Sequence, residues 1–276
     1  MREPRGRKHR NVVFGIGLTD AKEGFTVAVE CIHGLNEGLC DICYPKAVPA
    51  EAKQVRSRVA RATAPTSTRK STVDVGEQRI YHVTHVGNLA GILEAGALLA
   101  DARPTVDISS AENRESRRTA DVAGSTAASY VPFFLTPNAT LWEGIRLGNA
   151  DSRLSPESRH AVPSDFVILV STVRQTAELE AVVADGDAAG SLTRFGSTED
   201  GSERMLRRLH DDENSIIAAE FLVKRSFPFD LVTLIGVAHD KAREAIRPIL
   251  LASAHKPKVV VYPPWFQRPE GQIDRA

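Results

Sequence analysis

The 276-residue sequence is poor in the features that identify several common classes of protein. It has 3 cysteines, too few for a disulfide framework, and no apolar run that approaches the roughly 20 residues needed to cross a bilayer. The basic N-terminal residues are followed by no apolar segment of the secretory type. Neither sign of charge is in excess, because 35 Lys and Arg balance 35 Asp and Glu. We therefore expect a cytoplasmic protein of one or two domains without membrane association.

Motifs of several large enzyme classes are also absent. The sequence has no GxxxxGK[ST] phosphate loop, no GxSxG, no HExxH and no GxGxxG that opens a helix. These absences argue against P-loop nucleotide hydrolases, α/β-hydrolases, zincins and Rossmann dehydrogenases. What the chain does contain is an ordinary globular composition, with 42% hydrophobic and 25% charged residues, which is enough to bury a sizeable core.

The balanced charge conceals an uneven distribution. Residues 1–76 hold 13 Lys and Arg against 8 Asp and Glu, whereas the other 200 residues hold 22 against 27. The N-terminal part is therefore expected to attract a polyanion such as nucleic acid. A solvated basic linker explains the same charges, and the sequence does not decide between these two interpretations.

All three cysteines lie within one short segment of the N-terminal part. Cys31, His33, Cys40 and Cys43 give the spacing Cys-x-His-x6-Cys-x2-Cys. Two ligand pairs separated by a glycine-containing loop suit a tetrahedral Zn²⁺. Four ligands leave no open position, so the prediction is a structural zinc ion. The alternative is three buried thiols next to an unrelated histidine.

Proline, glycine and polar residues divide the chain into a Cys/His zinc-binding module (1–46), a basic helix and linker (47–77), a larger domain (78–265) and a tail (266–276). Two polar stretches of the larger domain, 101–129 and 176–214, are expected to be long ligand-binding loops. The expected fold class is α+β. Hydrophobic periodicity predicts strands at 79–85, 130–135, 166–172, 215–223, 232–237 and 258–262, and helices at 88–95, 139–147 and 239–251.

Four separated blocks of the larger domain occur in a typical order: RIYHVTHVGNLAGILEAGALL, the Arg-rich SAENRESRRTADV, YVPFFLTPNATLWEGIRLG and AAEFLV. In this order they resemble the DarT family of bacterial DNA ADP-ribosyltransferases over about residues 79–237. The resemblance implies an ADP-ribosyltransferase-like split β-sheet core with flanking helices, NAD⁺ as a substrate and single-stranded DNA as the target. It also implies a toxin or phage-defence effector with a macrodomain antitoxin as its partner. Phe134 and the following TPNATLW depart from the family pattern and mark a divergent member.

Glu220 is the candidate catalytic carboxylate, because it is the only acidic residue in the apolar run 216–223. ADP-ribosyl transfer passes through a ribose with oxocarbenium character, which an anionic group stabilises, and the attacking base must lose a proton. The resemblance implies that Glu220 holds a ribose hydroxyl and accepts that proton. The alternative from the pattern alone is a structural Glu paired with a neighbouring Arg.

The resemblance assigns four further residues to NAD⁺. It implies that His82 donates to the ribose and that Thr84 and Asn88 belong to the same NAD⁺-binding block. Tyr130, at the start of the next strand, is placed where an aromatic ring can stack on nicotinamide. Without the resemblance, His82 and Tyr130 are interpreted as core residues and Asn88 as a helix N-cap.

The Arg-rich block supplies the cations that the pyrophosphate requires. The resemblance implies one catalytic Arg before the 130–135 strand, and both Arg117 and Arg118 fit, with Arg114 in reserve. A solvated helix face is the alternative. The second polar stretch offers Arg194, Arg204, Arg207 and Arg208 to a nucleic-acid backbone and Phe195 to an unpaired base. A disordered insertion is the alternative for this stretch.

Two functions of different classes remain open at this point. One is an NAD⁺-dependent transferase that modifies a nucleobase of single-stranded DNA, or of RNA. The other is a non-catalytic adaptor, in which the zinc module binds nucleic acid or protein and the larger domain is a degenerate scaffold. The joint presence of His82, Asn88, an Arg pair and Glu220 favours the enzyme, because an adaptor has no need of them.

Overall fold

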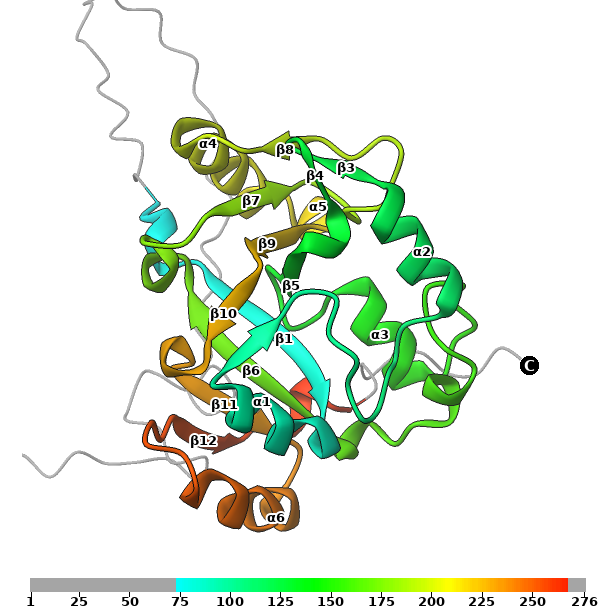
Figure 1. Ribbon diagram of the computed structural model, residues 1–276, viewed down its shortest axis with the longest axis vertical. Helices are drawn as coiled ribbons and strands as arrows, with labels where there is room; N and C mark the ends of the chain where they lie inside the picture. The colour runs from blue at the N-terminus through cyan, green and yellow to red at the C-terminus, as the bar shows by residue number, and fades with distance from the viewer. Residues whose placement is uncertain (1–72, 268–276) are drawn as a thin grey trace, which may run out of the picture. The chain divides into compact units, whose positions relative to one another are not determined.

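The computed structural model describes residues 73–267 (Figure 1). The predicted zinc-binding module at 1–46 and its four ligands lie outside the described residues, as do most of the linker and the tail. Residues 73–267 form a mixed α+β domain with one large sheet and flanking helices, which confirms the α+β fold class. None of the helices in this range is both long and apolar enough to span a bilayer.

The sheet has eight strands, and all neighbours are antiparallel except β11 and β12. The parallel pair is connected through α6 (Asp240–Leu251), as a parallel pair requires a crossover connection. In spatial order the strands are β12 (Lys258–Val261), β11 (Leu234–Val237), β6 (Phe166–Thr172), β1 (Arg79–His85), β5 (Tyr130–Phe134), β9 (Glu220–Lys224), β7 (Ala181–Ala184) and β8 (Phe195–Gly196).

The sheet is nearly divided between β1 and β5. Strand β1 pairs with β6 along its whole length, but with β5 at one position only, Tyr81 opposite Phe134. Beyond that pair the two strands diverge, and the His82 side chain bridges them by a 2.9 Å hydrogen bond from Nδ1 to the Pro132 carbonyl. The divergence leaves side chains of both strands facing a common opening.

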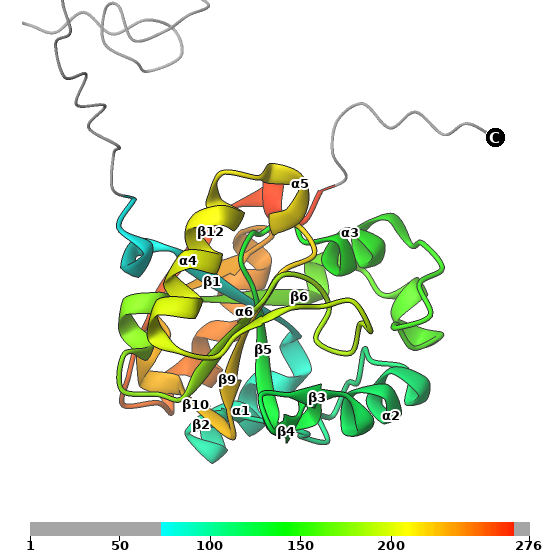
Figure 2. The same ribbon diagram turned by 90° about the horizontal axis from the view of Figure 1, so that it is seen from above.

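Side-chain alternation along the strands distributes the core over both faces of the sheet. Ile80 belongs to the largest core cluster, which also takes up buried residues of α1 (Leu89–Ala95), α4 (Glu199–His210) and α6. The next residue, Tyr81, belongs to a second cluster with Trp142 of α3 (Thr140–Leu147). Helices α3 and α4 accordingly lie on opposite sides of the strands (Figure 2).

Most regular elements agree with the sequence-based prediction. The strands at 79–85 and 166–172 and the helices at 88–95, 139–147 and 239–251 are confirmed to within one residue at each end. Gly96 ends α1 in the left-handed conformation, with a φ of 66°, and its N–H donates to the Leu93 carbonyl. Short 3-10 helices complete the described chain at Val75–Glu77, Val86–Asn88, Ala127–Ser129, Glu157–His160, Pro163–Asp165, Val173–Thr176, Phe229–Leu231 and Pro263–Trp265.

The predicted strand at 215–223 is wrong in its first half. Residues Glu213–Ile216 form the short helix α5, and β9 begins only at Glu220. The Asp212 side chain accepts hydrogen bonds from the N–H groups of Asn214 and Ser215, which starts a helix instead of a strand. Ile216 and Ala218 therefore do not share a strand face with Glu220.

The two polar stretches predicted as loops contain regular structure. The first holds α2 (Ala111–Thr119), β3 (Asp121–Val122) and β4 (Ser125–Thr126), and the second holds β7, β8 and α4. Polar composition hid α4, because its buried stripe consists of Leu206 and Leu209 only. A separate two-stranded pair joins β2 (Ala97–Leu99) to β10 (Ser226–Pro228).

Gly236 of β11 allows Trp265 to cover the sheet. A Cβ atom at this position would lie 2.6 Å from two ring carbons of Trp265. That ring meets Tyr81 edge-on at 5.6 Å, and the Trp265 carbonyl accepts a 2.7 Å hydrogen bond from Trp142 Nε1. We expect Gly236→Ala to lower the free energy of unfolding by about 1–3 kcal/mol, because the indole must move. Urea denaturation measures this.

Gly91→Ala is the matched control, because a Cβ there meets no atom within 4 Å and Gly91 lies inside α1. Its expected effect is stabilisation by about 0.5–1 kcal/mol from helix propensity. Equal losses in both variants would contradict the packing argument.

Candidate active site

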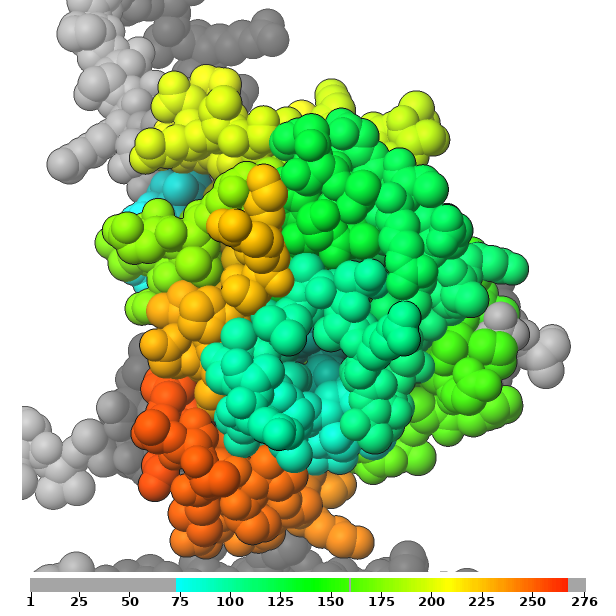
Figure 3. Space-filling model, in the orientation of Figure 1, coloured from blue at the N-terminus to red at the C-terminus, as the bar shows by residue number. Residues whose placement is uncertain are grey.

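A cavity of about 490 Å³ opens where β1 and β5 diverge. Figure 3 shows its mouth as a dark hollow among the cyan and teal residues of the first part of the domain. The volume lies within the range of small-molecule sites. Its charged lining residues are balanced in sign: Arg103, Arg114, Arg117 and Arg153 against Asp101, Asp107, Asp187 and Glu220.

Glu220 is the most deeply buried carboxylate of the cavity. It begins β9 between Phe134 of β5 and Ala184 of β7, and only 6% of it is exposed. Its Oε2 accepts hydrogen bonds from Arg117 Nη1 at 3.2 Å and from the Ala188 N–H at 3.3 Å. Burial raises the pKa of the Glu220 carboxyl, and although Arg117 opposes the rise, the net shift is upward. A carboxylate of this kind is a better proton acceptor than an exposed one.

Helix α2 delivers Arg117 to Glu220. Ser110 caps the start of this helix by accepting from the Asn113 N–H at 3.1 Å, and the last turn carries Arg117 and Arg118. Arg117 turns into the cavity, whereas Arg118 pairs with Asp101 at 3.2 Å and does not line the cavity. Of the two arginines that the sequence left open, Arg117 is therefore the one that contacts Glu220, and its catalytic role stays a prediction.

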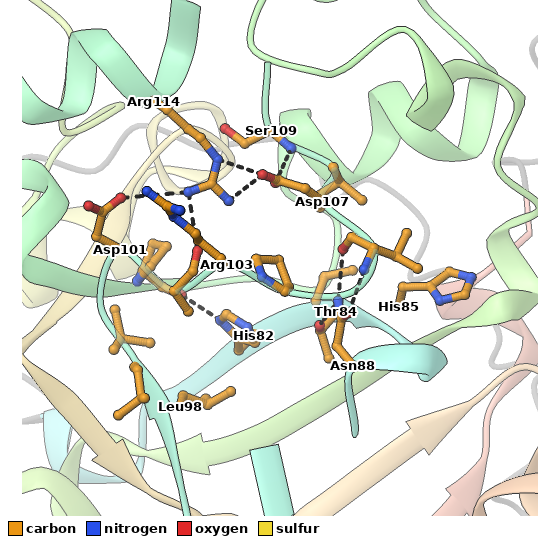
Figure 4. Close-up of a pocket in the computed structure, with 18 of the residues that line it drawn as sticks. His82, Thr84, His85, Asn88, Leu98, Asp101, Arg103, Asp107, Ser109 and Arg114 are labelled. Atoms are coloured by element: carbon orange, nitrogen blue, oxygen red, sulfur yellow. Dashed lines mark hydrogen bonds and ion pairs between the residues drawn. The ribbon is translucent and has the colours of Figure 1, made fainter. Parts of the chain in front are cut away.

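Arg114 lines the cavity one turn earlier on α2. It forms an ion pair with Asp107, lies 3.6 Å from Asp101, and donates to the Ala102 carbonyl. Figure 4 shows Arg114 between the two carboxylates. The side chain therefore ties the segment after β2 to α2. Sequence reasoning missed Asp101 and Asp107, because no local pattern indicates that they meet an arginine of the next helix.

His82 has a defined tautomer. A carbonyl oxygen only accepts, so Nδ1, which bonds to Pro132, carries the proton. Burial lowers the pKa of His82, more than the hydrogen bond to Pro132 raises it, so the ring is neutral at neutral pH. Its Nε2 is then an acceptor. This differs from the expectation that His82 donates to the ribose.

Asn88 organises the wall of the cavity rather than capping a helix. It occupies the position before α1 but makes no side-chain cap bond. Instead Nδ2 donates to Thr84 Oγ1 at 3.1 Å and to the Val106 carbonyl, and Oδ1 accepts from the Val106 N–H at 2.8 Å (Figure 4). Asn88 therefore holds the segment around Val106 over β1.

Tyr130 lines the cavity but is only 2% exposed, and its hydroxyl donates to the Val122 carbonyl at 3.3 Å. The ring belongs to a core cluster with Val182 and Leu222. Tyr130 is therefore a core residue that also reaches the cavity wall, and its stacking on nicotinamide stays a prediction.

The predicted target-contacting residues of the second polar stretch do not line this cavity. Arg194 and Arg208 both pair with Asp185, at 2.8 and 2.9 Å, and Arg207 pairs with Glu203 on α4. Asp187, from the same stretch, and Arg153 do line it, and sequence reasoning missed both. Within residues 73–267 no group of three or more His, Cys, Asp or Glu side chains is arranged to hold a metal ion.

Comparison with known proteins identifies the family of the chain. A family model described as "ssDNA thymidine ADP-ribosyltransferase, DarT" matches residues 81–267. The DNA ADP-ribosyl transferase of Mycobacterium tuberculosis is 29% identical over 204 residues, which cover 67% of this chain and 86% of the relative. That of Thermus sp. (strain 2.9) is 29% identical over 210 residues, covering 68% and 95%.

Two solved structures of Thermus sp. 2.9 DarT share the fold at 26% identity, each covering 69% of this chain. For the complex with ADP-ribosylated ssDNA the TM-score is 0.59, and the match covers 96% of the DarT chain. For the complex with NAD⁺ the TM-score is 0.57, and the match covers 98% of the DarT chain. The fold is thus that of a DNA ADP-ribosyltransferase. The chain belongs to the DarT family, which confirms the family expected from the four sequence blocks.

Because its folded-state pKa is raised, the Glu220 carboxyl should cost stability when it ionises. The folded protein binds this proton more tightly than the unfolded chain does. Stability is therefore lost as the pH rises from the ordinary glutamate value through the raised one. We expect Glu220→Gln to have a higher Tm than the wild type above that window and a similar Tm below it, because the amide oxygen still accepts from Arg117 and Ala188. Scanning calorimetry from acidic to mildly alkaline pH measures the difference.

The exposed Glu178 supplies the control, since Glu178→Gln removes a carboxylate without burial. Its Tm should follow the wild type at every pH. A Glu220→Gln variant less stable than the wild type at alkaline pH would show that the Arg117 pair outweighs burial.

Proposed function

We propose that this chain transfers the ADP-ribosyl group of NAD⁺ to a thymine base of single-stranded DNA. The observation that carries the proposal is the buried Glu220–Arg117 pair on the wall of a 490 Å³ cavity, in a chain of the DarT family. The family description names thymidine, and the relatives are DNA ADP-ribosyl transferases.

In the proposed reaction the bond between nicotinamide and the ribose breaks, and its electron pair leaves with nicotinamide. The ribose carbon gains positive charge, which the Glu220 carboxylate stabilises at close range. A base nitrogen then bonds to that carbon, and its proton passes to Glu220. Arg117 holds the carboxylate in place, and His82 accepts a hydrogen bond from a ribose hydroxyl through Nε2.

Thymine suits a site with a strong proton acceptor. It carries one ring N–H, between two carbonyl groups, and this proton must leave when the nitrogen becomes the acceptor of ADP-ribose. In a duplex the same N–H is paired with adenine. A single strand exposes it without the cost of opening a pair.

Two cationic side chains are proposed to bind the pyrophosphate. Arg114 lines the cavity, and Arg103, on the segment that Arg114 ties down, has no ion pair within residues 73–267. A guanidinium matches phosphate oxygens in a bidentate manner. NAD⁺ then competes with Asp101 and Asp107 for Arg114, so binding loosens or rearranges the segment that carries them.

The N-terminal part is proposed to assist this domain. Cys31, His33, Cys40 and Cys43 are the proposed zinc ligands, and the excess of Lys and Arg in residues 1–76 is the proposed contact with the DNA strand. A role as a toxin or phage-defence effector, opposed by a macrodomain antitoxin, follows from the resemblance to the family.

Labelled NAD⁺ should transfer its label to oligo(dT), and much less to oligo(dA), oligo(dC), oligo(dG) or oligo(rU). Glu220→Gln should lower kcat by about 10²–10⁴-fold, because the proton acceptor is lost. Gel separation of nucleic acid from protein measures both results, and Glu178→Gln should keep the wild-type rate. Label confined to protein, or a strong signal on oligo(rU), would contradict the target assignment.

Elemental analysis of the full chain should find about one zinc per molecule, held by the four N-terminal ligands. Cys40→Ser/Cys43→Ser should lose it, because two of the four thiolate and imidazole ligands are gone. Metal-free wild-type protein with unchanged DNA affinity would refute the zinc proposal.

A further inference from the structure

Two charged residues that the proposed reaction does not use share the cavity with Glu220, and one of them, Asp187, is close enough to raise its pKa. Asp187 and Arg153 both line the cavity, and Arg153 Nη1 lies 3.1 Å from Asp187 Oδ2. They are 34 positions apart in the sequence and come from different segments, one between α3 and β6 and one between β7 and β8. The Arg153 side chain is 30% exposed and the Asp187 side chain 22%, so the pair is partly shielded from water.

Asp187 starts the tight turn that presents the Ala188 N–H to Glu220. Its Oδ1 accepts from the Ala189 N–H at 2.8 Å, and its carbonyl accepts from the Gly190 N–H at 2.8 Å and from Thr193 Oγ1 at 2.6 Å. A Cβ on Gly190 would lie 2.7 Å from Thr193 Oγ1, so the turn has no spare room. The direction of the Ala188 N–H therefore depends on where Asp187 is held.

The orientation of the Arg153 guanidinium is fixed by a second carboxylate, that of Asp151. Asp151 accepts from Arg153 Nε at 3.0 Å and from Nη2 at 2.7 Å, in the two-pronged geometry typical of guanidinium and carboxylate. This leaves Nη1 as the group that meets Asp187. The guanidinium thus anchors the turn to the segment after α3.

We propose that Arg153 and Asp187 are positioning residues for Glu220, a pair that holds the turn at 187–190 so that the Ala188 N–H stays on the Glu220 carboxylate. The inference rests on the proposed function of Glu220. Neither side chain is assigned a contact with the reacting atoms.

The pair also sets the charge around Glu220. The charged groups that face this carboxyl are Arg117 from α2 and Asp187 from the turn, while its strand neighbours Phe134 and Ala184 are apolar. Across the cavity, His82 is neutral. Asp187 favours the protonated form of Glu220, and Arg153 partly neutralises Asp187.

Removal of either partner therefore has opposite effects on the protonation of Glu220. Arg153→Met leaves Asp187 uncompensated, which raises the pKa of Glu220 further. Asp187→Asn removes a negative charge while its Oδ1 still accepts from Ala189, which lowers the pKa of Glu220.

The test is the pH dependence of kcat for the full chain with NAD⁺ and oligo(dT). We expect the acidic limb to move to higher pH in Arg153→Met and to lower pH in Asp187→Asn. In both variants kcat at the optimum should fall by roughly 10-fold, because a displaced turn misplaces Glu220, while KM for NAD⁺ changes little. Arg174→Met is the matched control, since Arg174 also contacts two carboxylates, Asp74 and Glu77, but does not line the cavity.

The inference is overturned if the acidic limbs of the two kcat–pH profiles move in the same direction. It is also overturned if both limbs keep the wild-type position while Tm falls, which would make Arg153 and Asp187 a purely structural ion pair. The same protonation shift is measurable without turnover. For the wild type, Arg153→Met and Asp187→Asn, the Tm is compared with that of the same protein carrying Glu220→Gln in addition. The pH at which the two Tm values separate should move to higher pH in Arg153→Met and to lower pH in Asp187→Asn. Transfer that does not depend on Glu220 in any background would instead overturn the proposed function.

Discussion

The structure depends on one costly feature, a carboxylate buried in a β-sheet. Glu220 is 94% removed from solvent, being 6% exposed, and an ionised side chain in such a place needs partners. It finds two, Arg117 from α2 and the Ala188 N–H from the turn after β7. Neither partner suffices to return the pKa of Glu220 to its usual range, because burial is the larger influence. The fold thus disfavours charge on Glu220, and pKa shifts of this kind are common among catalytic acids and bases.

The division of the sheet between β1 and β5 opens the cavity that Glu220 lines. If the two strands paired along their length, the backbone groups around Pro132 would be occupied and the side chains of His82 and Glu220 would be enclosed in a continuous core. One pair at Tyr81 and Phe134 keeps the halves together, and the His82 ring satisfies the Pro132 carbonyl that the ladder leaves free. The same hydrogen bond selects the His82 tautomer, so the break in the sheet and the chemistry of the ring are linked.

Charge compensation continues around the cavity wall. Four arginines and four carboxylates line it, and several already form ion pairs with one another. The 200 residues after Gly76 carry more acidic than basic side chains, so the catalytic domain as a whole does not attract a polyanion. The proposed phosphate contacts are therefore individual guanidinium groups within the cavity and the basic residues of the N-terminal part.

The sequence by itself determined the fold class, the strands with simple apolar patterns and the identity of the buried carboxylate, because alternation and the four motif blocks are local properties of the chain. Only the tertiary structure decided which of Arg117 and Arg118 contacts Glu220, because the two are neighbours about 100° apart on a helix and cannot both face it. It also revealed α4, which has too few buried apolar residues to show helical periodicity in the sequence. It revealed α5 as well, which begins at the Asp212 cap although the residues after it form an apolar run that predicts a strand. Sequence reasoning missed Asp187 and Arg153 because their role depends on a contact between two segments far apart in the chain. A single sequence does not show which distant segments come into contact.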